Sequence, residues 1–142
     1  MNELVLISPN NLPNIINLVY PKIDAATAYS NGKYQGSDIL QQLVSGHMQL
    51  WAAVNENEEI QAIAITEIAN YPRIRVMRFL CATGENVEEW INHIDAMEAW
   101  GQSHGCKDFE AVVRPGWQKL LKPKGYSVSH SILNKDLGHG NA

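Results

Sequence analysis

The spacing of apolar and polar residues in the first third of the chain predicts one strand and two helices. Residues 3–7 (ELVLI) form a short apolar run that predicts a strand. Apolar residues then recur at helical spacing over residues 12–19 and again over residues 39–44. We expect Pro21 to permit a break in the first helix and Gly46 to end the second.

The middle of the chain predicts three antiparallel strands joined by short turns. Two apolar runs, residues 50–54 and 60–68, flank the polar segment 55–59, which is the pattern of a hairpin. Residues 73–81 alternate between apolar and basic side chains and predict a third strand. Strands this close in sequence are expected to pair as antiparallel neighbours.

The last third predicts a long helix, a strand, a short helix and a final strand. Residues 86–104 carry apolar residues at steps of three and four, which predicts the longest helix of the chain. Residues 109–113 predict a buried strand, residues 114–121 a short helix and residues 126–137 a last strand. A strand, helix, strand unit calls for a parallel, right-handed crossover. The expected fold is therefore α/β, with a mixed β-sheet flanked by helices on both faces.

Length and composition limit the number of domains and the classes of function. The chain has 142 residues, 45% of them apolar, which fits a single domain. We expect that domain over residues 1–137, with a frayed tail over residues 138–142. The net charge is −4 without a Lys/Arg cluster, so nucleic acid is not an expected partner.

The sequence also allows predictions of the cellular location of the protein and of the state of its two cysteines. No apolar run reaches the roughly 20 residues that span a bilayer, and the N-terminus lacks the pattern of a secretion signal. We therefore expect a cytoplasmic protein without membrane contact. Cys81 and Cys106 are far apart and make no metal-binding pattern, so we expect two buried free thiols.

Two segments carry a resemblance to a known family. Residues 49–54 (QLWAAV) and 60–63 (IQAI), with a polar turn between them, look like the second and third strands of the GNAT acyltransferase superfamily. Residues 120–126 (LLKPKGY) are similar to the FYEKxGF segment of that superfamily. With the order of elements, the resemblance covers almost the whole chain. The phrases MQLW, YPR, HGC and RPGW further resemble small GNAT-like proteins of bacteriophages and prophages.

The resemblance implies a site for acyl-CoA, and the sequence departs from the family at that site. The superfamily holds the CoA pyrophosphate with a loop of the pattern Arg/Gln-x-x-Gly-x-Gly/Ala before the central helix, where backbone N–H groups bind the anion. The equivalent segment, residues 81–89, has one glycine and three glutamates, and these glutamates repel a pyrophosphate. If CoA binds, the residues implied are Cys81, Ala82, Thr83, Gly84 and Asn86.

A second departure concerns the catalytic acid. Many members of the superfamily protonate the leaving thiolate with a tyrosine four residues before a conserved glycine. In this chain that glycine is Gly125, and the fourth residue before it is Leu121, which cannot donate a proton. The family also usually ends in a strand hairpin, whereas this chain has residues for one strand after Gly125.

Three functions are compatible with these features. The first is a catalytically degenerate, phage-type GNAT-like protein without a cofactor, which contacts a protein partner and is incorporated in the virion or ejection apparatus. The second is an acyl-CoA-dependent N-acetyltransferase with a non-standard CoA loop. The third is a sensor that binds a small molecule or peptide between the central parallel strands without chemistry.

Glu67 and Glu110 are the candidate catalytic residues. Glu67 lies at the end of the second hairpin strand, near where a GNAT amine base could sit. The competing interpretation is a surface ion pair with Arg73 or Arg75 across the turn. Glu110 lies within an apolar strand, where burial would raise its pKa, or it faces water on an alternating strand.

Arg75, Arg78 and Trp100 are the candidates for contact with a substrate or partner. Arg78 shares a strand face with apolar residues and is either an anion ligand or the partner of a carboxylate on the sheet. Trp100 lies at the edge of the apolar stripe of its helix, which is typical of a partner contact. His93 and His104 are eleven residues apart, without the spacing of a metal-binding pair, so we expect surface histidines and no metal.

Overall fold

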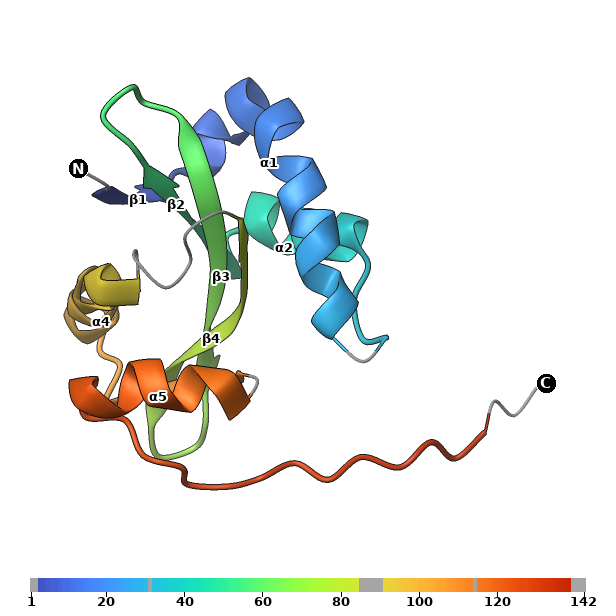
Figure 1. Cartoon of the computed structure of the whole chain (residues 1–142), viewed down its shortest axis with the longest axis vertical. Helices are drawn as coiled ribbons and strands as arrows, with labels where there is room; N and C mark the ends of the chain where they lie inside the picture. Colours follow the sequence, from blue (N-terminus) through green and yellow to red (C-terminus); the bar gives the residue numbers. More distant parts are fainter. Residues whose placement is uncertain (1–2, 31, 85–90, 114, 139–142) are drawn as a thin grey trace.

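The computed structural model describes residues 3–30, 32–84, 91–113 and 115–138 (Figure 1). Its strands and helices follow one another in the predicted order up to the last helix. They are β1 (Glu3–Ile7), α1 (Leu12–Ala26), α2 (Gly36–Ser45), β2 (Met48–Val54), β3 (Ile60–Asn70), β4 (Arg75–Gly84), α4 (Ile94–Ser103), β5 (Asp108–Ala111) and α5 (Gln118–Leu121). Short 3-10 turns precede α1, α4 and α5 and follow α1 and α5.

The five strands form one mixed sheet in the order β1-β2-β3-β4-β5. The first four strands pair as antiparallel neighbours, and β4 pairs with β5 in parallel. The parallel pair is joined through α4, as a parallel connection needs a long crossover. The predicted α/β class and mixed sheet are confirmed.

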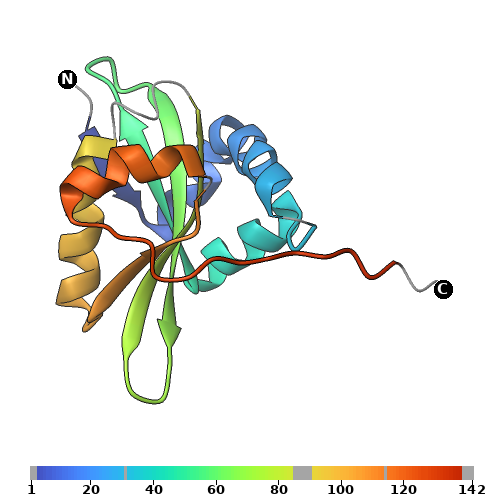
Figure 2. The ribbon, with the colours of Figure 1, turned by 60° about the horizontal axis from the view of Figure 1, so that its bottom comes forward.

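Helices cover both faces of this sheet and bury one apolar cluster on each (Figures 1 and 2). Side chains of α1 and α2 pack on one face of β2 and β3, and side chains of α4 and α5 pack on the other face. The α1/α2 cluster consists of Leu12, Val19, Ile23, Ile39, Leu43, Met48, Leu50, Ile63 and Ile65. The α4/α5 cluster consists of Trp51, Ala53, Ala62, Ala64, Met77, Phe79, Ile91, Ile94, Met97, Cys106 and Leu121.

Helix α1 continues through Pro21, where the sequence permitted a break. A proline inside a helix removes one backbone hydrogen bond and crowds the preceding turn. Val19 and Ile23 lie on either side of Pro21 and are both fully buried against the sheet. The apolar area that these turns bury offsets the local cost of the proline.

The predicted last strand is wrong. Gly125, at φ 94°, ends the 3-10 turn after α5, and the structure contains no strand over residues 126–138. Only Tyr126 packs on the body of the protein; the chain then runs outward in extended form (Figures 1 and 2). The alternation of this segment suits a strand, but a strand forms only where another strand pairs with it.

None of the helices in the described part of the chain is long and apolar enough to cross a bilayer.

Candidate functional site

Strand β5 pairs with the first part of β4 and ends before β4 does. Their register begins at Val76 opposite Asp108 and ends at Phe79 opposite Ala111, and the N–H of Val112 donates to the carbonyl of Phe79 at 3.0 Å. β4 continues over residues 80–84, where β3 is its only strand neighbour among the described residues. The edge of β4 that faces away from β3 therefore carries backbone groups that no strand pairs.

Glu67, Arg78 and Glu110 form a charged row across three strands, which we call the acidic row. The register places Glu67 opposite Arg78 and Arg78 opposite Glu110. Arg78 Nη1 lies 3.2 Å from Glu67 Oε1, and Arg78 Nε lies 3.4 Å from Glu110 Oε1. This row is adjacent to the Phe79–Ala111 pair, the last of the parallel pairing. The structure thus brings both candidate acids and one candidate arginine together near the end of β5.

The acidic row lies on the sheet face that α1 and α2 cover. Residues two apart on a strand share a face, so Glu67 lies on the same face of β3 as Ile63 and Ile65, which belong to the α1/α2 cluster. Its other cross-strand neighbour, Met48, belongs to the same cluster. The side chain of Glu67 is 23% exposed and that of Glu110 is 45% exposed. Glu67 is thus the more enclosed of the two carboxylates.

The expected partners of Glu67 are wrong, although an ion pair is present. Glu67 pairs with Arg78, and not with Arg73 or Arg75. The N–H of Tyr71 donates to the carbonyl of Ile74 at 2.9 Å and closes the turn, so counting outward from this turn places residue 67 opposite residue 78. Glu110 is neither buried nor alone, because it is the second carboxylate on Arg78.

Arg75 has a structural role at the hairpin turn. Its Nε donates to Asn70 Oδ1 and its Nη1 to the carbonyl of His104, both at 2.7 Å. The second contact joins the turn to the C-terminal end of α4, where cations are favourable to the helix dipole. Arg75 therefore holds two elements together.

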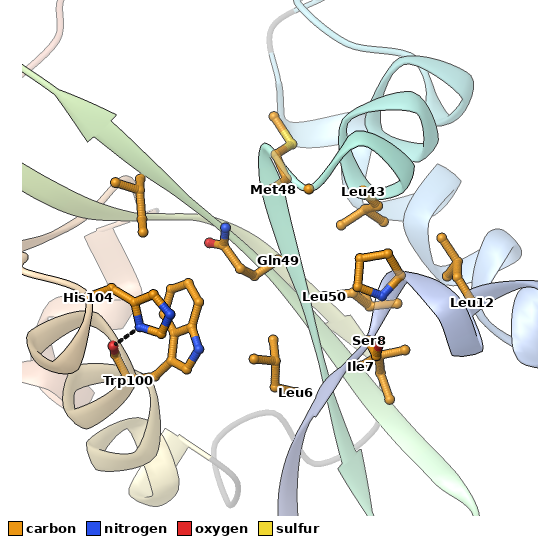
Figure 3. A pocket seen from close by; sticks show the side chains of 13 residues that line it. Leu6, Ile7, Ser8, Leu12, Leu43, Met48, Gln49, Leu50, Trp100 and His104 are labelled. Atoms are coloured by element: carbon orange, nitrogen blue, oxygen red, sulfur yellow. Dashed lines mark hydrogen bonds between the residues drawn. The ribbon is translucent and has the colours of Figure 1, made fainter.

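Trp100 is half-buried and lies at one wall of an apolar pocket of about 350 Å³ (Figure 3). Its ring meets Trp51 edge-on at a centroid distance of 6.0 Å and stacks on His104 at 4.0 Å. The opposite wall comes from Leu43 and Leu50. The pocket thus places Trp100 where an apolar group could reach it.

A buried polar chain behind this pocket was missed by the sequence analysis. Trp51 Nε1 donates to Thr66 Oγ1, and Thr66 Oγ1 donates to Gln49 Oε1, each at 2.9 Å. Thr66 is completely buried, and Gln49 lines the pocket. Since the pocket walls are mostly aliphatic and aromatic, this recess suits an apolar group beside one amide rather than an anion.

Four of the five residues implied for CoA binding belong to a strand rather than to a loop. Cys81, Ala82, Thr83 and Gly84 form the last part of β4 and pair with β3. Asn86 and the three glutamates of residues 85–89 lie outside the described residues. The prediction that the strand ends at residue 81 is therefore wrong.

Neither cysteine has the properties of a nucleophile. Burial raises the pKa of the Cys81 thiol to about 11. Burial also raises the pKa of Cys106, although the charge of Arg75 opposes this shift. Both thiols are protonated at neutral pH, where only a thiolate would attack a substrate. Among the described residues, no three His, Cys, Asp or Glu side chains are grouped as metal ligands would be.

Leu121, which the sequence resemblance aligns with the family's catalytic tyrosine, lies in the core. It is 3% exposed and belongs to the α4/α5 cluster. The hydroxyl of the nearby Tyr126 donates to Glu98 on α4. Burial first, and then Glu98 and Asp95, raise the pKa of Tyr126 well above its usual range. Tyr126 therefore anchors the start of the C-terminal segment to α4.

We expect Gly84→Ala to lower the free energy of unfolding by about 1–3 kcal/mol, measured by urea denaturation. Gly84 has φ +134°, and an added Cβ would lie 2.4 Å from the Cα of Ala62 and from the carbonyl oxygen of Gln61. Gly116→Ala is the control, because a Cβ there meets nothing within 4 Å. The same loss in both variants would contradict the close approach of β3 and β4 at Gly84.

The order of elements and the mixed five-stranded sheet match the fold of the GNAT acyltransferases, and solved structures confirm this fold. A probable acetyltransferase superposes with a TM-score of 0.71 at 10% identity, over 99% of this chain and 99% of that chain. An aminoglycoside acetyltransferase from a soil metagenomic sample, in complex with sisomicin, gives 0.68 at 11% identity, over 96% and 95%. A predicted acetyltransferase with acetyl-CoA from Clostridium acetobutylicum gives 0.67 at 12% identity, over 96% and 97%.

Neither the family models nor the curated proteins include a match to this sequence. The resemblance in structure therefore shows a shared fold. The finer resemblance to phage proteins stays a prediction.

Proposed function

We propose that this protein is an acyl-CoA-dependent N-acyltransferase. The observation that carries the proposal is the end of β5 at Ala111, which leaves residues 80–83 of β4 without a described strand on that side, within a fold shared with acetyltransferases. Residues 80–83 on the open edge of β4 are Leu, Cys, Ala and Thr, so no charged side chain among them opposes a thioester and its apolar arm. The N–H groups of this edge are suited to hold the thioester carbonyl, as fixed backbone donors stabilise the charge that develops there.

Glu67 is the residue proposed to accept the proton of an acceptor amine. Acyl transfer forms the bond from the amine nitrogen to the acyl carbon and breaks the bond from that carbon to sulfur, and acetyl-CoA supplies the activated acyl group. The amine loses a proton in this step, and a carboxylate within reach can take it. Arg78, at 3.2 Å, fixes the orientation of the Glu67 carboxylate. Since Leu121 offers no proton, we propose that the proton for the leaving sulfur comes from solvent.

The charge of the acidic row favours a basic acceptor. Two carboxylates, Glu67 and Glu110, share the one guanidinium of Arg78, which leaves a net negative charge. A primary amine is cationic at neutral pH and is attracted to such a row. The amine gives up this first proton to solvent, and Glu67 takes the second proton when the neutral amine attacks the acyl carbon. We therefore propose an amine as the acceptor.

The test is a thermal-shift titration of the full chain with acetyl-CoA. A ligand that binds only the folded state adds about 2.7 kcal/mol of stability at 100 times its Kd, so we expect a saturable rise in Tm. ATP at the same concentrations controls for non-specific anion binding. A flat response to acetyl-CoA up to millimolar concentration would contradict the proposal.

A second candidate rests on Leu121. Its burial in the core, where the family has a catalytic tyrosine, favours a non-catalytic GNAT-like protein that contacts a protein partner. If this candidate is right, acetyl-CoA causes no rise in Tm in the same titration. The two candidates therefore give opposite results in one experiment.

A further inference from the structure

The apolar pocket of about 350 Å³ lies at the end of the sheet where β1 stops (Figure 3). β1 ends at Ile7, which pairs with Leu50, whereas β2 begins two residues earlier, at Met48. The chain leaves the sheet at Ser8, so the first residues of β2 have no neighbour on that side among the described strands. The pocket forms at this place, with α2 on one side and α4 on the other.

Two side-chain N–H donors belong to this pocket. Thr66 Oγ1 accepts from Trp51 and donates its own hydrogen to Gln49 Oε1, which turns the NH2 group of Gln49 away from Thr66. Among the described residues, no group accepts a hydrogen bond from this NH2 group or from the indole N–H of Trp100. In Figure 3 the indole nitrogen of Trp100 lies on the ring edge toward Leu6. Both donors are therefore available to a ligand.

These donors are held in place before a ligand binds. The ring of Trp100 meets Trp51 edge-on and stacks on His104, whose Nδ1 donates to the carbonyl of Trp100 at 2.8 Å. The amide of Gln49 is fixed by the completely buried Thr66. Groups that are already ordered lose little conformational freedom on binding, which favours affinity.

The rest of the pocket is mostly apolar and favours a neutral ligand. None of the residues that line it is Lys, Arg, Asp or Glu. An ionised ligand would lose its hydration here without gaining a counter-charge, which is costly. A neutral carbonyl group avoids this cost, and the two lone pairs of its oxygen can accept from two N–H groups. Apolar walls with a few directed polar groups are typical of small-molecule sites, whose volumes start at roughly 300 Å³.

We propose that this pocket binds a small neutral molecule in which an apolar body carries a carbonyl oxygen, such as a ketone, an ester or an amide. The carbonyl oxygen accepts from the NH2 group of Gln49 and from the indole N–H of Trp100. The apolar body lies against the aliphatic side chains of Leu6, Leu43 and Leu50. This site is at the β1 side of the sheet and the open edge of β4 is beyond β3, so the inference goes beyond the proposed function.

The test is a titration of the full, ¹⁵N-labelled chain with acetophenone, followed by NMR. We expect a saturable shift of two side-chain signals, the indole N–H of Trp100 and the NH2 group of Gln49. Ethylbenzene has nearly the same shape as acetophenone but no acceptor, and benzoate replaces its methyl group with a charged oxygen. We expect ethylbenzene to bind about three- to tenfold more weakly, which is the usual contribution of one neutral hydrogen bond. Benzoate should also bind more weakly than acetophenone.

Two tryptophan variants test the donor directly. Trp100→Phe keeps an aromatic ring but removes the indole N–H, so we expect acetophenone to bind about three- to tenfold more weakly and ethylbenzene to bind as before. The NH2 signal of Gln49 reports the affinity in this variant. Trp117→Phe is the matched control, because Trp117 is also half-buried but does not line the pocket. Its affinities for both ligands should not change.

Four outcomes would overturn the inference. Equal affinities for acetophenone and ethylbenzene would mean that the carbonyl oxygen is not recognised. Tighter binding of benzoate would mean that the pocket takes anions. Equal losses for acetophenone and ethylbenzene in Trp100→Phe would mean that the ring and not its N–H matters. No shift of either signal up to the solubility limit of acetophenone would exclude the site. Every titration is made without acetyl-CoA, so this inference and the proposed function succeed or fail separately.

Discussion

Replacing Glu67 with glutamine is expected to lower kcat/KM for acyl transfer to an amine by about 10²–10⁴, the usual contribution of a general base. Glutamine keeps the shape and one hydrogen bond to Arg78 but cannot take up the proton. The binding of acetyl-CoA should not change, because residue 67 lies on β3 and not on the open edge of β4. Steady-state kinetics and the thermal-shift titration measure the two effects separately.

Glu110→Gln is the matched control for this substitution. Glu110 forms an ion pair with the same Arg78 but is 45% exposed on the edge strand. An exposed ion pair contributes at most about 1 kcal/mol, so we expect no more than about a fivefold loss of kcat/KM. Unchanged turnover in E67Q would exclude Glu67 as the base. Equal losses of kcat/KM in the Glu67→Gln and Glu110→Gln variants would indicate that both substitutions act through Arg78.

Phe79→Ala is expected to lower the free energy of unfolding by about 3–5 kcal/mol, which is the usual cost of a phenylalanine truncated in a core. The side chain is 1% exposed, and its ring lies 5.6 Å from that of Trp117 in the turn before α5. Phe79 also belongs to the last row in which β4 and β5 pair. The substitution therefore leaves a cavity in the core next to the end of β5.

Urea denaturation of the unaltered protein and of Phe79→Ala measures this loss of unfolding free energy, with Leu18→Ala as the control. Leu18 lies on α1 and is 63% exposed, so its truncation should change stability by less than about 0.5 kcal/mol. A loss below about 1 kcal/mol in Phe79→Ala would mean that the core beneath α5 is not packed as described.

The elements that could be predicted are those in which local pattern and burial agree. The first strand, residues 3–7, has the predicted bounds because its apolar run faces a paired neighbour. The break permitted at Pro21 did not occur because the burial of Val19 and Ile23 is a tertiary effect. The last strand failed for the opposite reason, since no strand among the described residues pairs with it.

The candidate site could be predicted in part. Glu67, Arg78 and Glu110 were each chosen separately, and their common row depends on the register of three strands. Counting from the turn at Tyr71 gives the pair of Glu67 with Arg78. The pair of Arg78 with Glu110 depends on how the connection through α4 aligns β5 with β4. The chain from Trp51 through Thr66 to Gln49 joins residues 15 and 17 positions apart. No local pattern indicates such a contact.

The two apolar clusters also differ in when their residues become available during synthesis. All buried members of the α1/α2 cluster lie between Leu12 and Ile65, and the half-buried residues packed on them end at Cys81. The α4/α5 cluster needs residues as late as Leu121. During synthesis, all residues of the α1/α2 cluster are therefore made before the α4/α5 cluster is complete. Nascent chains fold from the N-terminus as they emerge from the ribosome. The strands that carry the acidic row are the boundary between the early layer and the late one.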